Sequence, residues 1–348
     1  MKPTVPGRLH AQGLASPRFD TTVDVVRHLG CVQSQLHDMA LWAVARRTTG
    51  LTLSDAQAAF ERGDFLRTHI LRPTWHFVDP ADLHWLMALT APRIRQLMNS
   101  SWTALGLSPH LIDQGSEVIE AALADGAPHT RAELAAALEG AGLQATGTFL
   151  VHQLMNAEIN LLAANGPMRG KQHTYVALPP ATADRTYDEL LAEGARRYAR
   201  GHGPFRDKDL AWWTSLTLTE SRRAIELAEL RPLDVEGQAY WALDAPVDAD
   251  VPRVMLLSNF DEYISYARDP EDYAAFDGSV DDVMRGSGLL MIDGRLSGRW
   301  SRTITAKKVA VSVDRAPRLT GAVRRALDAE VAAFGHFVGR DPELLIAG

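Results

Sequence analysis

The chain of 348 residues contains a single cysteine, Cys31, and this scarcity excludes an intrachain disulfide. It also excludes zinc sites built on Cys-x-x-Cys pairs and iron–sulfur clusters with four cysteine ligands. The histidines are scattered, no HExxH sequence occurs, and no glycine-rich phosphate loop stands between a strand and a helix. We therefore expect neither a metal ion nor another cofactor.

Long apolar runs and an excess of basic residues are also missing. No run approaches the roughly 20 apolar residues that span a bilayer, and the first residues lack the apolar core of a signal peptide. With 46% hydrophobic and 23% charged residues, the composition is that of an ordinary soluble globular protein, which we expect to be cytoplasmic. The formal charge of −7 argues mildly against nucleic-acid binding, so a DNA partner would need a local basic face.

One pattern recurs along the chain, namely helices followed by two short apolar strands around a tight loop. Its copies occupy residues 54–78, 130–178 and 205–243. The first two open with the spacing of a capping box, Ser54 with Gln57 and Thr130 with Glu133. Helices followed by a hairpin are typical of winged-helix units, because a two-stranded wing is stable only when it packs on helices.

The last hundred residues have a different pattern. Asp293 and Gly294 form a strong hairpin signal, residues 308–314 alternate in polarity, and an amphipathic helix is expected from Thr320. We therefore predict an α+β fold in which three tandem winged-helix units precede a mainly β C-terminal domain with a terminal helix. The predicted domains are 1–100, 101–180, 181–246 and 247–348, and 243–252 is the predicted linker.

Six segments, spread in order over almost the whole chain, resemble a known family, the AlkZ-type winged-helix DNA glycosylases, which excise alkylated purines from bacterial DNA. They are GCVQSQ, RPTWHFVDPADL, RGKQHTYVAL, HGPFRDKDLAWWTSLTLTESRRAI, NFDEYISYARD and DGRLSGRW. The resemblance implies three winged helices that form a cleft and a C-terminal domain that is barrel-like. It also implies that Gln33 and Gln35, in the first unit, are the catalytic pair.

The residue between the two glutamines is Ser34, where such relatives usually have an aliphatic side chain, and this departure concerns packing more than chemistry. Some relatives have an aspartate at the second position. Gln35 therefore places the chain with the double-glutamine branch, whose members include self-resistance enzymes acting on bulky DNA adducts.

Two glutamines at positions i and i+2 face one substrate only if their segment is extended, since on a helix they lie about 200° apart. Gly30 permits the chain to leave the helix there. An amide cannot act as a general base. However, an N7-alkylated guanine is already cationic and leaves without an acid, so two carbonyls that position one water molecule suffice. The alternative interpretation is a pair of structural amides that bond to helix ends.

Two further polar candidates have both a functional and a structural interpretation. His76 could contact a phosphate or a flipped nucleotide, but a packed position within a wing is the more common role of such a histidine. Asp261 could lie near the cleft, although the sequence around it favours a turn in which Asp261 bonds to the backbone.

Basic candidates for DNA contact lie on two hairpins. Arg169 and Lys171 occupy the loop of the second wing, where they either bind phosphate or are simply solvated. Arg299 and Arg302, together with Arg295, Lys307 and Lys308, make the C-terminal hairpins basic enough to offset the acidic total.

The function predicted from these observations is a monofunctional DNA glycosylase that hydrolyses the N-glycosidic bond of cationic N-alkylpurines, N7-alkylguanine above all. Its partner is double-stranded DNA that contains such lesions, and we expect a monomer. The first alternative is a non-catalytic winged-helix DNA-binding protein, such as a transcriptional regulator, in which the glutamines are structural. The second alternative is a protein-interaction scaffold.

Overall fold

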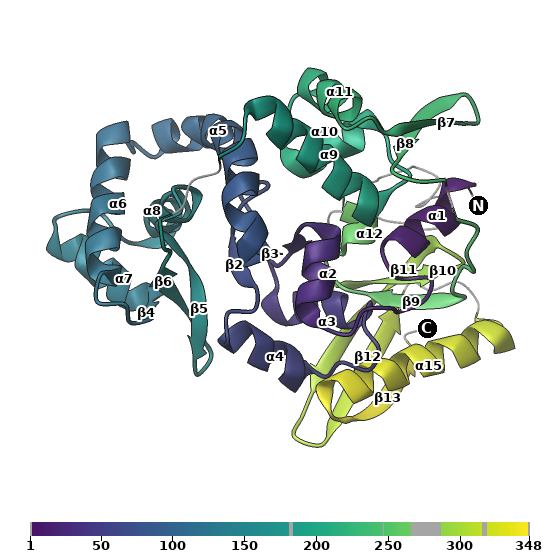
Figure 1. Cartoon of the computed structure of the whole chain (residues 1–348). Coiled ribbons are helices and arrows are strands. Elements are labelled where there is room, and N and C mark those ends of the chain that lie inside the picture. The colour runs from purple at the N-terminus through teal and green to yellow at the C-terminus, as the bar shows by residue number, and fades with distance from the viewer. Residues whose placement is uncertain (1, 181–183, 246, 266–286, 315–318, 347–348) are drawn as a thin grey trace. The chain divides into compact units, whose positions relative to one another are not determined.

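The computed structural model describes residues 2–180, 184–245, 247–265, 287–314 and 319–346, drawn in colour in Figure 1. The predicted α+β class is confirmed. The chain divides into two compact units. The first unit comprises Met1–Ala58, Arg196–Leu210 and Glu229–Gly348, and the second comprises Ala59–Ala195 and Ala211–Ala228. Among the described residues, no helix is both long enough and apolar enough to cross a bilayer.

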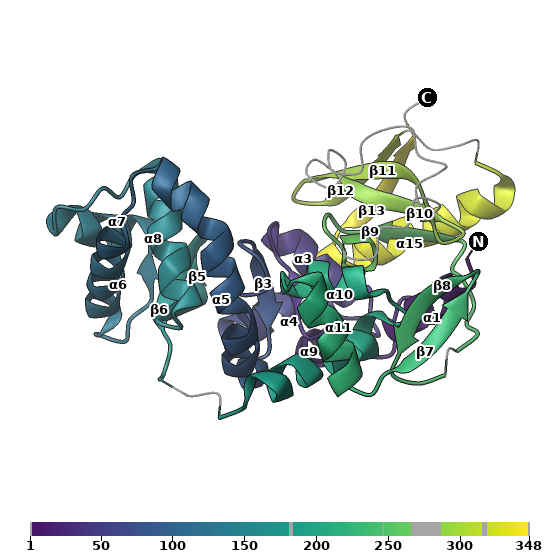
Figure 2. The same ribbon diagram turned by 90° about the horizontal axis from the view of Figure 1, so that it is seen from above.

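The first unit combines N-terminal helices with the C-terminal sheet. Its N-terminal elements are α1 (Thr4–Ala11), α2 (Thr22–Leu29), β1 (Val32–Gln33) and α3 (His37–Ala45). Its C-terminal elements are β9 (Val254–Leu257), α12 (Glu262–Ser265), β10 (Gly288–Ile292), β11 (Arg295–Ile304), β12 (Lys308–Asp314), α15 (Gly321–Val338) and β13 (Asp341–Ile346). The strand order is β13-β12-β11-β10-β9, antiparallel except for the parallel pair β12–β13. Helix α15 lies along this sheet in both views (Figures 1 and 2).

Apolar side chains from the two ends of the chain share one core in this unit. Val5 and Leu9 of α1 pack with Met255 and Leu257 of β9 and with Tyr263 of α12. On the other face of the sheet, Phe334 of α15 makes edge contacts with the rings of Trp42 and Trp300, with centroids 5.0 Å apart in both pairs. The N-terminal helices are thereby fixed to the sheet that carries α12.

The first unit has two tight turns, and one of them, Asp293-Gly294, was predicted from the sequence. Strands β7 (Arg231–Val235) and β8 (Gln238–Ala242) meet at Glu236-Gly237, and β10 and β11 meet at Asp293-Gly294. The φ angles are +54° and +77° in the first turn and +49° and +75° in the second. Two successive positive φ angles are typical of the type I′ turn, whose twist matches that of the strands it joins.

The second unit carries its own helices and sheet. Its elements are β2 (Leu66–His69), β3 (Trp75–Val78), α5 (Pro80–Ala104), α6 (Pro109–Leu123), β4 (His129–Thr130), α7 (Arg131–Gly140), α8 (Gly147–Ile159), β5 (Ala163–Arg169), β6 (Gln172–Ala177) and α11 (Leu218–Leu227). Three helices, α4 (Leu53–Glu61), α9 (Tyr187–His202) and α10 (Asp207–Thr214), cross from one unit into the other. The strands of this unit follow the order β3-β2-β5-β6-β4. Leucines of α6, α7 and α8 form the core beneath β5 and β6.

Local capping agrees with the sequence in one place and differs in another. The capping box of Thr130 and Glu133 is present at the start of α7, as predicted. At α4 the predicted box of Ser54 and Gln57 is wrong by two residues. There Thr52 accepts from the Asp55 N–H at 3.2 Å and Asp55 accepts from the Thr52 N–H at 3.1 Å. Asp55 thus takes the place of the glutamate or glutamine in the box. Because Thr52 is the capping residue, the helix starts earlier, at Leu53.

Two further elements differ from the sequence-based expectation. The sequence of residues 148–164 predicts one long helix, but α8 ends at Ile159, because Leu161 adopts a φ of +59° and Ala163–Arg169 becomes strand β5. Strand β13, which follows α15, was not predicted, because its residues lack a period-two pattern.

Candidate functional site

The segment Gln33-Ser34-Gln35 is not helical, which confirms the expectation for the glutamine pair. Helix α2 ends at Leu29, where Gly30 adopts a φ of +81° that favours glycine, and α3 begins at His37. Gln33 closes the short strand β1 and is only 5% exposed, whereas Gln35 is exposed. Within the described part of the chain, the Gln35 side chain makes no hydrogen bond. One glutamine is therefore held in the interior and the other faces outward.

A buried carboxyl group holds the backbone of the first glutamine. The Gln33 N–H donates to Oε1 of Glu262 at 2.7 Å, a length typical of a bond to a charged acceptor. The other oxygen of Glu262, Oε2, lies 3.1 Å from Nε2 of His202, and the side chains are 0% and 2% exposed. Sequence reasoning did not select Glu262 or His202, since neither belongs to a local motif that points to the glutamines.

His202 is a neutral imidazole at neutral pH. Burial, followed by the positive charges of Arg47 and Arg8, lowers the pKa of His202 to about 3. Its ring stacks on Tyr198 of the preceding helical turn, with ring centroids 4.5 Å apart. A neutral imidazole can donate from Nε2 to Oε2 of Glu262, which leaves Oε1 to accept from Gln33.

Asp261, a candidate from the sequence, lies in an ion pair inside the first unit. Its carboxylate receives two hydrogen bonds from Arg47, at 2.8 and 3.1 Å, and both side chains are 0% exposed. Arg47 directs its other donors to Gln12 and to the Ala43 carbonyl, so all five of its N–H groups are bonded. Asp261 also accepts from the Tyr263 N–H at 3.0 Å, which confirms the expected bond to the backbone. The last residues of the NFDEYISYARD segment, 266–269, lie outside the described residues.

His76 is a fully buried residue of the second unit. Its Nδ1 contacts the Thr74 carbonyl at 2.9 Å, and burial, followed by the charge of Arg72, lowers its pKa well below the usual value. This is the environment of a packed, neutral histidine, and a DNA contact by His76 stays a prediction.

A second buried polar cluster lies beside His76 and was missed in the sequence. His69 contacts Glu158 of α8, the Arg67 guanidinium donates to Asn165 of β5, and Asn165 donates to Glu158 at 3.4 Å. Burial lowers the pKa of Arg67 to about 10, although Glu158 acts in the opposite direction. The signal that could have revealed it is the placement of Arg67 and His69 on one face of β2.

Some of the basic candidates on the hairpins form ion pairs with acidic side chains, and others do not. Arg169 pairs with Glu133 at 2.7 Å, with side chains 53% and 45% exposed, whereas Lys171 is exposed beside Gly170 at the wing tip. In the C-terminal sheet, Arg299 pairs with Asp314 across β11 and β12 at 2.6 Å. That hydrogen bond raises the pKa of Arg299.

Among the basic candidates, Arg302 is the one whose charge interacts with a residue close to the glutamine segment. It is half-buried on β11, and burial lowers its pKa while attraction to Asp38 opposes the shift. Asp38 lies in the first turn of α3, three residues after Gln35. Gln33, Asp261 and Arg302 therefore belong to one unit, while His76, Arg169 and Lys171 belong to the other.

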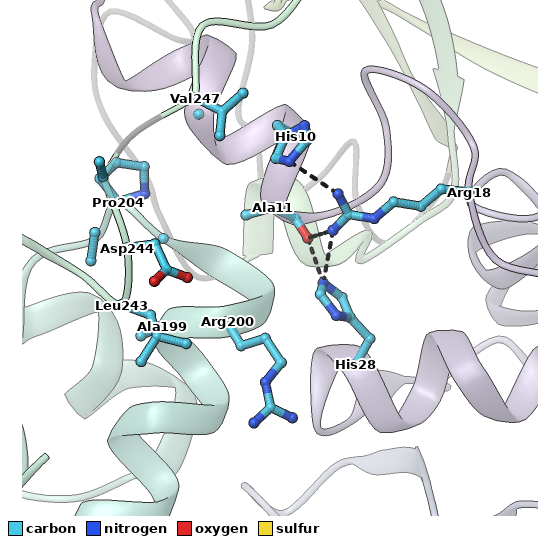
Figure 3. A pocket seen from close by; sticks show the side chains of 14 residues that line it. His10, Ala11, Arg18, His28, Ala199, Arg200, Pro204, Leu243, Asp244 and Val247 are labelled. Carbon is cyan, nitrogen blue, oxygen red and sulfur yellow. Dashed lines mark hydrogen bonds between the residues drawn. The ribbon is translucent and has the colours of Figure 1, made fainter.

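A cavity of about 220 Å³ lies in the first unit between α1, α2 and α9 (Figure 3). Its polar lining includes His10, Arg18, His28, Arg200 and Asp244, and none of the residues predicted from the sequence lines it. Arg18 donates to the Ala11 carbonyl at 3.2 Å, and His28 contacts the same carbonyl at 2.6 Å. Burial lowers the pKa of His28 to about 4. With both signs of charge on its walls, the cavity has no single ligand preference.

Metal ligands do not gather in the described residues, where no group of three or more His, Cys, Asp or Glu side chains could hold an ion. The arrangement around the glutamines is therefore one of amides, a carboxyl group and an imidazole. Such groups can orient water or a polar substrate by hydrogen bonds.

Known proteins resemble this chain over most of its length. A family model described as DNA glycosylase AlkZ-like matches residues 26–337. A curated protein of Streptomyces sahachiroi, named "Interstrand DNA cross-link repair glycosylase", is 24% identical over 319 residues, which are 84% of this chain and 85% of that protein. The solved structure of Streptomyces sahachiroi DNA glycosylase AlkZ has a TM-score of 0.77 and 22% identity over 100% of both chains, and so has the same fold. The chain therefore belongs to the AlkZ-like family of DNA glycosylases.

Proposed function

We propose that the protein is a monofunctional glycosylase that hydrolyses the N-glycosidic bond of cationic N-alkylpurines in double-stranded DNA. The observation that carries the proposal is the geometry of the glutamine segment. It leaves the helix at Gly30, is held by a backbone bond at Gln33, and exposes Gln35. Membership of the AlkZ-like family supports the same reaction class.

The chemistry of the substrate explains why amides suffice. N7-alkylation gives the purine a positive charge, so the base departs as a neutral molecule and needs no proton from the protein. Its departure builds oxocarbenium character on the sugar. Carbonyl dipoles fixed beforehand can stabilise that charge and hold the attacking water in line, without the reorganisation that solvent would require.

Both glutamines position the water molecule in this proposal. Gln33, buried and bonded through its backbone, is the fixed member of the pair, while the exposed Gln35 is the member that reaches the sugar. A lysine nucleophile is not part of the mechanism, so no Schiff base forms and the DNA strand stays intact.

The finer features of the fold and of the partner belong to the same proposal. Three tandem winged-helix units and a barrel-like C-terminal domain would present Arg169, Lys171, Arg299 and Arg302 to DNA phosphates, in a monomer that acts in the cytoplasm. The name of the Streptomyces sahachiroi relative supports the extension of the substrate class to bulky adducts and crosslinks.

Release of free base tests this function. We expect the protein to release N7-methylguanine from methylated duplex DNA and to leave an uncleaved strand with an abasic site. It should release little uracil, because two amides cannot protonate a neutral leaving base. Chromatography of the released bases and a gel of the labelled strand give both readouts. If DNA binds but no base appears in either assay, the alternative of a non-catalytic winged-helix binder is correct.

The second wing is expected to contribute to DNA affinity through its charges. If Arg169 and Lys171 both touch phosphates, the Arg169→Ala/Lys171→Ala variant should reduce the slope of log K against log salt by about 1.8, roughly 0.9 per contact. The control is Arg223→Ala, which removes another exposed arginine of the same unit, paired with Asp188 at 2.8 Å. An unchanged slope in the folded double variant places this wing outside the interface.

A further inference from the structure

Two adjacent acidic residues hold the two ends of the segment that carries the glutamines. Asp261 bonds to Arg47, just after α3, and Glu262 bonds to the backbone of Gln33, before α3. The preceding residue, Phe260, has a φ of +56°, which is rare for a bulky side chain and turns the chain sharply between β9 and α12. Successive side chains at this turn therefore reach different partners.

The surroundings of Glu262 require an acceptor toward Gln33 and a hydrogen-bond partner toward His202. The Gln33 peptide N–H is a donor that β1 directs at Oε1, and the contact with His202 occupies Oε2. A side chain without oxygen would leave the Gln33 N–H unbonded in the interior, where an unmade hydrogen bond is costly. The backbone would then move to find another partner.

We propose that Glu262 is a positioning residue for catalysis, which fixes the backbone of Gln33 and thereby the direction of both glutamine amides. Glu262 does not touch the substrate and acts through the glutamine segment. The inference rests on the proposed function, since the rate that it controls is that of base excision. The hydrogen bond from Gln33 to Glu262, which the inference requires, can be tested without an activity measurement.

His202 completes the arrangement from the far side of Glu262. It is stacked on Tyr198 and buried, so it restricts the carboxyl group to one rotamer. Positioning of this kind matters because a displacement of about 1 Å in a catalytic group can cost ~10²-fold in rate.

Single-turnover excision of N7-methylguanine by Glu262 variants tests the proposal. Glu262→Ala should lower the rate about 10- to 100-fold, with the DNA dissociation constant unchanged within about threefold, because phosphate contacts dominate affinity. Glu262→Gln should retain most of the rate, since its amide oxygen accepts from Gln33 and its NH₂ donates to the other tautomer of His202. Glu262→Asp, one methylene shorter, should be slow, and it serves in place of Glu262→Ala if that variant does not fold.

Glu330→Ala is the matched control. Glu330 also accepts a backbone N–H, that of Leu256 at 2.9 Å, and it also contacts a basic side chain, Arg46 at 3.3 Å. It is therefore a structural carboxylate of the same unit that has no bond to the glutamine segment. Its loss should reduce stability but leave the excision rate of the folded protein unchanged.

Amide hydrogen exchange at Gln33 separates failure of this inference from failure of the proposed function. The Gln33 amide should exchange slowly in the wild type and in Glu262→Gln, and faster in Glu262→Asp and Glu262→Ala, whether or not the protein excises any base. If the wild type shows this exchange pattern but excises no base, the proposed function is overturned. The positioning role of Glu262 in excision is then overturned with it. A wild-type excision rate in a folded Glu262→Ala or Glu262→Asp protein overturns the positioning role alone, as does an equal loss of rate in Glu330→Ala.

Discussion

Replacement of Gln35 by alanine is expected to lower the single-turnover release of N7-methylguanine about 10²–10³-fold, the typical loss for one preorganised polar group. Gln33→Ala should also be slow, and the double variant should lose less than the product of the two single losses, because residues that act as a unit are not additive. DNA affinity should change little in each variant, since it depends mainly on phosphate contacts.

The control for these substitutions is Gln57→Ala, which removes an exposed glutamine on α4. Its rate should equal that of the wild type. Because Gln33 is buried, thermal unfolding of each variant must show that the protein still folds. Equal rates for Gln35→Ala and Gln57→Ala in folded proteins would assign the glutamines a structural role.

The largest expected effect on stability concerns the buried ion pair between Arg47 and Asp261. Asp261→Ala should reduce the free energy of unfolding by about 3–5 kcal/mol, because it leaves an uncompensated guanidinium in the interior. Replacement of both partners, as in Arg47→Met/Asp261→Leu, should recover part of that loss, because no charge then remains buried. Urea denaturation of the wild type, the single variant and the double variant measures the free energy of unfolding.

An exposed ion pair of the same unit provides the comparison. Arg253 and Asp293 lie 2.8 Å apart with side chains 56% and 51% exposed, so Arg253→Ala should cost no more than about 1 kcal/mol. If Asp261→Ala is no more destabilising than Arg253→Ala, the first unit does not depend on the buried pair.

Local features were predictable from the sequence because their causes are local. The Asp293-Gly294 turn follows from two residues that tolerate positive φ, and the Thr130 capping box follows from a three-residue spacing. The break in the helix around the glutamines was also predictable. It followed from Gly30 and from the requirement that residues i and i+2 face one substrate.

The partners of the glutamine segment were not predictable in this way. Glu262 is 229 positions from Gln33, and no local rule distinguishes it from its neighbour Asp261, which a turn motif favours instead. The same holds for Arg302 and Asp38, which approach each other only once β11 and α3 are folded into one unit. Both side chains are buried, and their partners separate the roles: Asp261 pairs with Arg47, whereas Glu262 accepts from the backbone of Gln33.

The central claim is that Gln33 and Gln35 direct water to a sugar whose base is already cationic. The most direct test is single-turnover release of base by the wild type and by Gln33→Ala/Gln35→Ala, on matched duplexes that contain one N7-methylguanine or one uracil. We predict rapid release of N7-methylguanine by the wild type, little release of uracil, and a loss of N7-methylguanine release of at least about 10²-fold in the folded double variant. Full activity of that variant would contradict the claim and place the chemistry on other residues.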